Sequence, residues 1–222
     1  MKVLDGRGAV VTGGSRGIGR AIVERSGHIG GRALGVQADL AVADAVDRLM
    51  AAAAGELDGL DIVVHNAAAD VATAAISDTS DQVWDLSMNA NAMTAFRLTR
   101  HAARTMRDGG RILHISTLNT TRPAPGNAPY AASKGAIEQL TKVAALELGP
   151  RQITVNAICP GATDTELLRR ANPSEALAQV AVMTPLGRLG RPEDIADVVG
   201  LLACPDSRWI TGHIINVAGG LA

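Results

Sequence analysis

A tyrosine and a lysine four residues apart, Tyr130 and Lys134, are the residues best suited to chemistry in this chain of 222 amino acids. Four residues make about one helical turn, so the phenol and the ammonium lie on one face of the predicted helix. A free tyrosine has a pKa of about 10, and a cation a few ångströms away lowers it by roughly 1–3 units. The pair is therefore suited to general acid–base catalysis. The alternative for these two residues alone is a surface tyrosine beside a lysine.

A glycine-rich turn near the N-terminus is typical of dinucleotide binding. The apolar run 9–11 predicts a strand, and the turn 12–19, with the spacing G-x-x-x-G-x-G, leads from it into a predicted helix. Glycines allow a tight turn and let backbone N–H groups approach a pyrophosphate at the positive end of the helix. Arg16, inside the turn, is placed to pair with an additional phosphate. An ordinary glycine loop is the alternative interpretation.

Strand-like and helix-like stretches alternate along the chain. This pattern predicts an α/β fold, a Rossmann-like doubly wound parallel sheet with helices on both faces. The later predicted strands are 32–39, 60–66, 111–116, 153–158 and 214–217, and the predicted helices are 44–54, 80–107, 130–148 and 192–202, with two short helices within 164–183. The core candidates of helix 80–107 are Trp84, Leu86, Met88, Phe96, Leu98 and Met106. A single domain over 1–222 is expected, with a mobile substrate flap at 162–187.

The stretch after the glycine turn is short for such a fold. Only twelve residues, 20–31, separate the turn from the next strand-like run. A doubly wound half-domain needs a helix, a strand and a helix there, and that strand usually ends in the residue that reads the adenosine ribose. Either the chain lacks one strand and one helix, or the sequence does not record a segment near 23–31.

Composition excludes several classes of function. The net charge is −1 and no basic block occurs, so neither nucleic acid nor a membrane surface is expected as a partner. No run approaches the roughly 20 apolar residues of a membrane span, and the charged N-terminus is unlike a signal peptide. Cys159 and Cys204 are expected to be reduced thiols, which indicates the cytoplasm. Histidine and cysteine spacing predicts no metal site.

Taken together, these motifs resemble those of the short-chain dehydrogenase/reductase family, in order and over nearly the whole chain. The resemblance rests on the turn 12–19, the triplets 38–40 and 66–68, and the segments 130–134 and 156–161. It implies hydride transfer between a nicotinamide dinucleotide and a carbonyl or alcohol substrate of the ketone, aldehyde or 3-oxoacyl type. Arg16 is similar to the residue of family members that prefer NADP(H), so NADP(H) is expected over NAD(H). A homo-oligomer, tetramer or dimer, is also implied.

The resemblance further implies roles for the catalytic residues. Tyr130 would be the acid/base, and Lys134 would hold the nicotinamide ribose and lower the pKa of Tyr130. The hydroxyl that holds the substrate carbonyl would be Thr117, thirteen residues before the tyrosine, or its neighbour Ser116. Asn91, with Asn89 as the near miss, would anchor a water that connects Lys134 with solvent.

It implies cofactor contacts as well. Asp39 would meet the adenine, Asn66 the adenosine ribose, and Thr163 or Thr165 the nicotinamide side. The residues expected around the pyrophosphate are Gly13, Ser15, Arg16, Gly17, Ile18 and Gly19, and the further expected contacts are Leu40, Ala67, Ala68, Tyr130, Lys134, Pro160 and Gly161.

Three departures from the family pattern concern the cofactor end and leave the catalytic residues intact. The strand and helix after the turn are missing. His65 and Ala68 stand where Asn and Gly are common, and a methyl at position 68 would crowd the cofactor. Ala218 stands where Asp is frequent.

A non-catalytic relative that binds nucleotide weakly or assembles with partners is the alternative function, and dehydratase or epimerase chemistry stays open. Arg122, Arg169 and Arg170 are weak hints of an acidic substrate.

Overall fold

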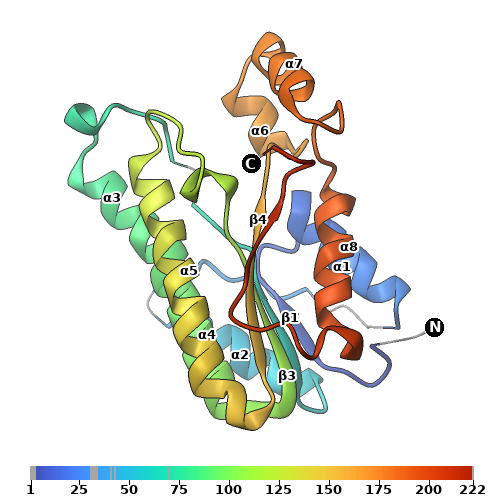
Figure 1. Ribbon diagram of the computed structural model, residues 1–222. Coiled ribbons are helices and arrows are strands. Elements are labelled where there is room, and N and C mark those ends of the chain that lie inside the picture. The colour runs from blue at the N-terminus through green and yellow to red at the C-terminus, as the bar shows by residue number, and fades with distance from the viewer. Residues whose placement is uncertain (1–3, 31–34, 41, 43, 70, 222) are drawn as a thin grey trace.

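A single parallel sheet forms the centre of the computed structural model, which describes residues 4–30, 35–40, 42, 44–69 and 71–221 (Figure 1). Its five strands stand in the order β1-β2-β3-β4-β5, and each neighbouring pair is parallel. The strands are β1 (Ala9–Val11), β2 (Leu60–His65), β3 (Met106–Ile115), β4 (Thr154–Pro160) and β5 (Ile214–Val217). The prediction of a Rossmann-like parallel sheet is confirmed.

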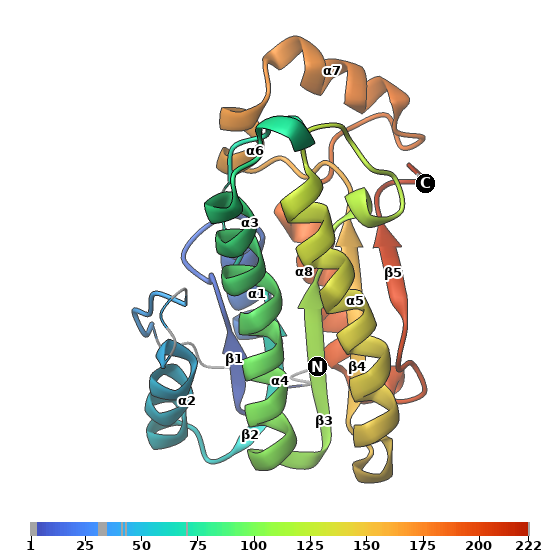
Figure 2. The ribbon, with the colours of Figure 1, turned by 90° about the vertical axis from the view of Figure 1, so that its left-hand side faces the viewer.

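Helices cover both faces of this sheet. On one face lie α1 (Gly17–His28) and α8 (Pro192–Ala203), and on the other lie α4 (Thr94–Thr105) and α5 (Ala128–Leu148) (Figures 1 and 2). The shorter helices are α2 (Ala45–Glu56), α3 (Asp81–Ser87), α6 (Glu166–Ala171) and α7 (Ser174–Met183). Figure 2 shows α6 and α7 above the carboxyl ends of the strands. Within the described residues, no helix is both long and apolar enough to span a bilayer.

Two hydrophobic clusters fill the space between the sheet and its helices. One joins Ile62 and Val64 of β2 to α1 and α8, and the other joins Val63 to α2, α4 and α5. Neighbouring residues of β2 thus face opposite clusters, as expected for a parallel strand buried on both sides. Each fully buried Ile or Val stabilises the fold by about 1.5–3 kcal/mol, so these clusters fix the positions of the strand ends.

The segment 80–107 differs from the single helix predicted for it. It forms α3, a π-helix at Met88–Met93 and then α4, and β3 begins at Met106, before the predicted start. Leu98 and Met106 are buried and Met88 is partly buried, but Trp84, Leu86 and Phe96 are 44–45% exposed. The reason is that α4 packs through Ala95, Leu98, Thr99 and Ala102, the i, i+3, i+4, i+7 face, and Phe96 lies off this face.

The strand predicted at 32–39 does not form in its described part, residues 35–39. Residues 31–34 lie outside the described residues, and 35–39 form no strand and are exposed. The described sheet therefore has β1 at its edge, with β2 as its partner. In Figure 2, α2 lies beside that edge.

Gly19 and Gly27, both in α1, provide a matched test of how the glycine turn is packed. A Cβ at Gly19 would collide with the carbonyl oxygen of Gly13 and lie 2.5 Å from Nδ2 of Asn66, whereas a Cβ at Gly27 would meet nothing within 4 Å. We expect Gly19→Ala to lower the free energy of unfolding by about 1–3 kcal/mol. Gly27→Ala should raise it by up to about 1 kcal/mol, since alanine favours helix. Urea unfolding followed by circular dichroism measures both, and equal stability of the two variants would contradict the packing.

Candidate active site

Lys134 is the most deeply buried charged group of the site, with 1% of its surface exposed. Its Nζ donates a hydrogen bond of 2.7 Å to the carbonyl oxygen of Ile115, the last residue of β3. It also lies 5.7 Å from the centroid of the Tyr130 ring. Burial lowers the pKa of Lys134 to about 8, and the nearby Cys159 and Glu138 oppose this shift. The amine is therefore mostly charged at neutral pH.

Tyr130 and Thr117 meet beside this lysine, and Thr117 is one of the two hydroxyls that the family resemblance implied. The two side chains share a hydrogen bond that lowers the pKa of Tyr130, but burial has the larger effect and raises that pKa above its ordinary value. The lowered pKa predicted from Lys134 is not found. The ammonium is directed at the Ile115 carbonyl and lies over the aromatic ring. The phenol is consequently protonated at neutral pH.

Ser116, the other candidate hydroxyl, binds a buried carboxylate instead. Its Oγ donates to Oε1 of Glu138 at 2.6 Å, and Oγ1 of Thr120 donates to the same atom at 2.7 Å. The thiol of Cys159 lies 3.3 Å from that oxygen, and burial raises the pKa of Cys159 to about 12, so the thiol stays a donor. These contacts leave Thr117 as the hydroxyl that faces Tyr130. Sequence reasoning missed Glu138, although its position four residues after Lys134 placed it on the same helical face.

Asn91 lies in the π-helix and is fully buried. Its Oδ1 accepts a hydrogen bond from the backbone N–H of Ala69, and its Nδ2 donates to Oγ of Ser133, both at 2.9 Å. Asn89, the near miss, is exposed. Asn91 therefore ties the loop after β2 to α5 at the residue before Lys134. π-Helical turns are frequent at functional sites, and this one directs an amide into the site.

The glycine turn has the geometry that an anion needs. Gly13 and Gly17 have φ angles of +66° and +52°, values that favour glycine. Helix α1 begins at Gly17 without a side-chain cap and without an acidic residue in its first turn. Its first N–H groups are thus available to a pyrophosphate. Ser15 and Arg16 are exposed beside the turn, while Ile18 packs on the core.

Thr12 and Asn66 hold this turn against the end of β2. Nδ2 of Asn66 donates to the carbonyl oxygens of Thr12 and Gly13 at 3.1 and 3.3 Å. The Thr12 hydroxyl accepts from the backbone N–H groups of Asn66 and Ala67 at 3.0 and 3.1 Å. The Asn66 amide nitrogen is therefore engaged with the turn, and the neighbouring Ala68 is exposed. Sequence reasoning missed the part that Thr12 plays.

The remaining predicted cofactor residues come from two loops. Asp39 is exposed and Leu40 is partly buried, and the carbonyl oxygen of Leu40 accepts from Oγ1 of Thr94 at 3.2 Å. After Pro160, the loop continues through Gly161 to Thr163, which is 6% exposed and donates to the Gly161 carbonyl at 3.0 Å.

Thr165 brings the second loop to the glycine turn. It caps α6 through a hydrogen bond from the Leu168 N–H, and its methyl would lie 3.4 Å from a Cβ at Gly17. The chain after β4 and the turn after β1 therefore meet at the carboxyl edge of the sheet.

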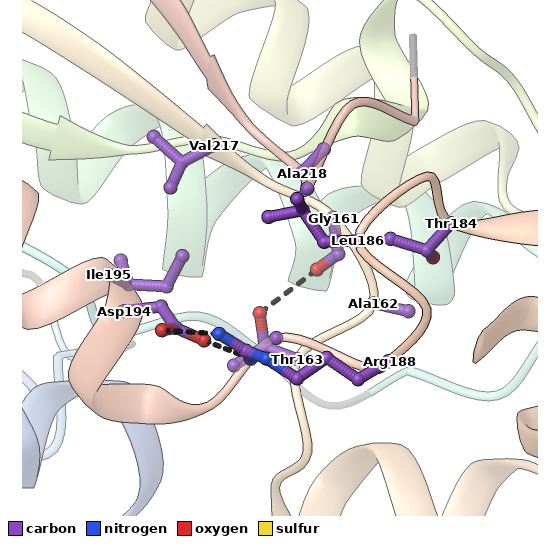
Figure 3. Close-up of a pocket in the computed structure, with 12 residues that line it drawn as sticks. Gly161, Ala162, Thr163, Thr184, Leu186, Arg188, Asp194, Ile195, Val217 and Ala218 are labelled. Atoms are coloured by element: carbon purple, nitrogen blue, oxygen red, sulfur yellow. Dashed lines mark hydrogen bonds and ion pairs between the residues drawn. The ribbon is translucent and has the colours of Figure 1, made fainter.

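A pocket of about 130 Å³ is lined by the loop after β4, the end of β5, the segment 184–190 and the first turn of α8 (Figure 3). Gly161 and Thr163 line it, but Tyr130 and Thr117 do not. Its one guanidinium, Arg188, binds both oxygens of Asp194 at 2.5 and 2.9 Å. The pocket thus has no unpaired charge for an ionic ligand.

In the described part of the chain, no three histidine, cysteine or acidic side chains are placed to hold a metal.

Comparison with known proteins finds similarity to reductases and other oxidoreductases, both in sequence and in structure. The family model described as enoyl-(acyl carrier protein) reductase matches residues 5–222. An uncharacterised oxidoreductase of Methylorubrum extorquens is 36% identical, with both chains covered completely, over an alignment of 248 residues against the 222 of this chain. A solved short-chain dehydrogenase/reductase of Serratia marcescens has a TM-score of 0.93 and 36% identity, with 99% of each chain covered. The angucycline C-6 ketoreductase LanV, solved with bound NADP, has a TM-score of 0.90 and 35% identity, with 99% of this chain and 96% of the other covered.

The single tyrosine of the chain allows a direct test of the Thr117 contact. Because the hydrogen bond from Thr117 lowers the pKa of Tyr130, we expect Thr117→Val to raise that pKa. Ser116→Ala, the matched control, should leave it unchanged, since Ser116 binds Glu138. Alkaline titration of tyrosinate absorbance measures Tyr130 alone, because tryptophan does not ionise. Circular dichroism at each pH restricts the data to folded protein, and an unchanged pKa in Thr117→Val would contradict the contact.

Proposed function

The chain belongs to the short-chain dehydrogenase/reductase family and is an NAD(P)-dependent oxidoreductase, and on that premise we propose that it reduces ketones with NADPH. One observation carries the proposal: a protonated phenol, a hydroxyl and a buried ammonium converge at the ends of β3 and α5. A carbonyl oxygen placed there would receive a proton and a hydrogen bond from two side chains that already contact each other.

The side chains fit a nicotinamide dinucleotide. An ammonium has three N–H donors, and the Ile115 carbonyl takes one of them, so Lys134 has donors to offer to ribose hydroxyls. The uncapped start of α1 suits the pyrophosphate. Thr163 or Thr165 would contact the nicotinamide side, and Asp39, Leu40, Asn66, Ala67 and Ala68 would lie along the adenosine. Ser15, Arg16 and Ile18 would flank the phosphates, while Pro160 and Gly161 would border the nicotinamide.

Reduction of a ketone requires a hydride at the carbonyl carbon and a proton at the oxygen. A bound reduced nicotinamide supplies the hydride. Tyr130 donates the proton, and its raised pKa keeps the phenol protonated at neutral pH until charge develops on the substrate oxygen. The Thr117 hydroxyl donates a hydrogen bond to the same oxygen. The Lys134 ammonium offsets the negative charge that remains on Tyr130 after the transfer, and Asn91 holds α5 and would anchor the water through which the proton is replaced.

The segment 162–187, which we propose is the substrate flap, favours an apolar ketone. Its exposed side chains include Val182, Met183 and Leu186, which are 85, 55 and 70% exposed. The two flap arginines are paired, Arg169 with Asp164 at 2.6 Å and Arg170 with Glu166 at 4.0 Å, which does not favour an acidic substrate. LanV, which was solved with bound NADP, is named a ketoreductase, and this supports ketones as the substrate class. Higher kcat/KM for oxo acids than for uncharged cyclic ketones would contradict the assignment.

We propose NADP(H) over NAD(H) because of Arg16. It is exposed beside the glycine turn, and among the described residues it forms no ion pair within 4.0 Å, so its guanidinium is open to a phosphate. The NADP bound to LanV supports this preference. Equal dissociation constants for NADPH and NADH would contradict it.

We also propose a cytoplasmic homo-oligomer, a tetramer or dimer. Phe96, Val143 and Leu146 leave 45, 51 and 81% of their surfaces exposed along α4 and α5, and Trp209 near β5 is 94% exposed. Such apolar surface is typical of an interface. The free thiols of Cys159 and Cys204 support a reducing compartment. A monomeric mass in solution would contradict the oligomer.

Tyr130→Phe tests the proton donor. The variant lacks only the hydroxyl, so we expect the rate of NADPH-dependent ketone reduction to fall by at least about 10²-fold. The fold and the affinity for NADPH should be retained. The rate is measured from NADPH absorbance with a panel of cyclic ketones, and the affinity by calorimetry. Undiminished turnover of the variant would contradict the mechanism, and a wild-type chain that binds NADPH without turnover would favour the non-catalytic relative.

The lowered pKa of Lys134 predicts a pH dependence. Its pKa in the folded chain is about 8, so the ammonium is present below that pH and is lost as the pH rises through it. We expect kcat/KM for reduction, which reports the free enzyme, to fall above about pH 8. A pH–rate profile measures this, and a constant kcat/KM up to pH 9.5 would show that the charge is not required.

A further inference from the structure

The glycine turn lies at the border of the sheet rather than in its middle. Among the described residues, β1 pairs with β2, and the sheet order begins at β1. In doubly wound dinucleotide folds, further strands stand outside the first one, and the next strand ends in the residue that reads the adenosine ribose. These outer strands form the wall against which the adenosine half of the coenzyme rests. The described sheet has no strand outside β1, so this wall is the part of the fold that differs.

The chain between α1 and α2 is too short for two further strands with a crossover between them. Helix α1 ends at His28 and α2 begins at Ala45. A parallel crossover takes about a dozen residues or more, and each strand takes about five more. Residues 35–39 are exposed and form no strand. The longer alignment with the Methylorubrum relative agrees with a shortened chain.

The nicotinamide half, by contrast, is offered three nearly buried polar side chains. Lys134, Thr117 and Thr163 are 1, 8 and 6% exposed and come from α5 and the ends of β3 and β4. The pyrophosphate turn is braced by Thr12 and Asn66. On the adenosine side, the residues proposed above are Asp39, Leu40, Asn66, Ala67 and Ala68. The Asn66 amide nitrogen is engaged with the glycine turn, and the loop of Asp39 and Leu40 is tied to Thr94 through the Leu40 carbonyl. Recognition of the two halves is therefore unequal.

We propose that the chain recognises the nicotinamide mononucleotide half of the coenzyme and leaves the adenosine half largely in solvent. Reduced nicotinamide mononucleotide (NMNH) is then both a ligand and a hydride donor for ketone reduction. The inference rests on the proposed function, because it assumes the same nicotinamide site. It adds that the adenosine contributes little affinity beyond the contact of Arg16 with a 2′-phosphate.

Calorimetric titration of the full chain with NMNH and with 5′-AMP tests the inference. The two probes each carry one ribose and one phosphate, so they differ in the group on the ribose. We expect NMNH to bind at least about tenfold more tightly than 5′-AMP. Lys134→Met, which removes the proposed ribose contact, should weaken NMNH at least about tenfold and leave 5′-AMP unchanged. NMNH should also be oxidised in the presence of a ketone that NADPH reduces.

The outcomes separate the inference from the function on which it rests. If 5′-AMP binds as tightly as NMNH, or more tightly, the adenosine half is recognised and the inference is overturned, while NADPH-dependent reduction would keep the proposed function intact. If neither NADPH nor NMNH binds, both proposals are wrong. Tight NMNH binding that is insensitive to Lys134→Met would place the ligand elsewhere and also overturn the inference.

Discussion

A charged amine inside the protein is the constraint on which the site depends. Burial of an ammonium costs several kcal/mol unless hydrogen bonds and opposite charge compensate it. The Ile115 carbonyl supplies the bond at 2.7 Å, and the buried Glu138 supplies the charge one turn further along α5. Glu138 in turn binds Ser116 and Thr120. The network that stabilises Lys134 therefore also fixes the segment that presents Thr117 to Tyr130.

Two buried histidines near this ammonium are neutral and add no second positive charge. His65 and His114 are register partners on β2 and β3, with ring centroids 5.8 Å apart. Burial, aided by the charge of Lys134, lowers the pKa of His65 well below its ordinary value and that of His114 to about 3. Both imidazoles are therefore uncharged at neutral pH. His65 stands where the family commonly has Asn. It is fully buried in β2 and, being neutral, adds no second cation to the site.

The features that sequence could predict are those encoded within one or two helical turns. The Tyr130–Lys134 spacing, the glycine turn and the β5 bounds fall in this class, because periodicity and turn chemistry act locally. The assignment of Thr117 over Ser116 depended on Glu138, 22 residues from Ser116, and no local pattern reports such a contact. Proximity of Tyr130 to a cation was predictable, but the burial that raises its pKa was not. Trp84 and Phe96 were misplaced for a similar reason, since composition does not say which face of a helix meets the core.

The same distinction applies to the proposed coenzyme site, because β1 lies at the edge of the sheet that the described residues form. Tyr130, Lys134 and Thr117 belong to α5 and to the end of β3, on the side of β2 away from the edge. The glycine turn is held from that same side, because Thr12 and Asn66 join it to β2 rather than to an outer strand. On the proposal above, the short connection after α1 reduces the surface for the adenosine without removing the hydrogen bonds that position the turn. The residues proposed for catalysis and the outer surface proposed to be reduced thus lie on opposite sides of β1, so one can be reduced while the other persists.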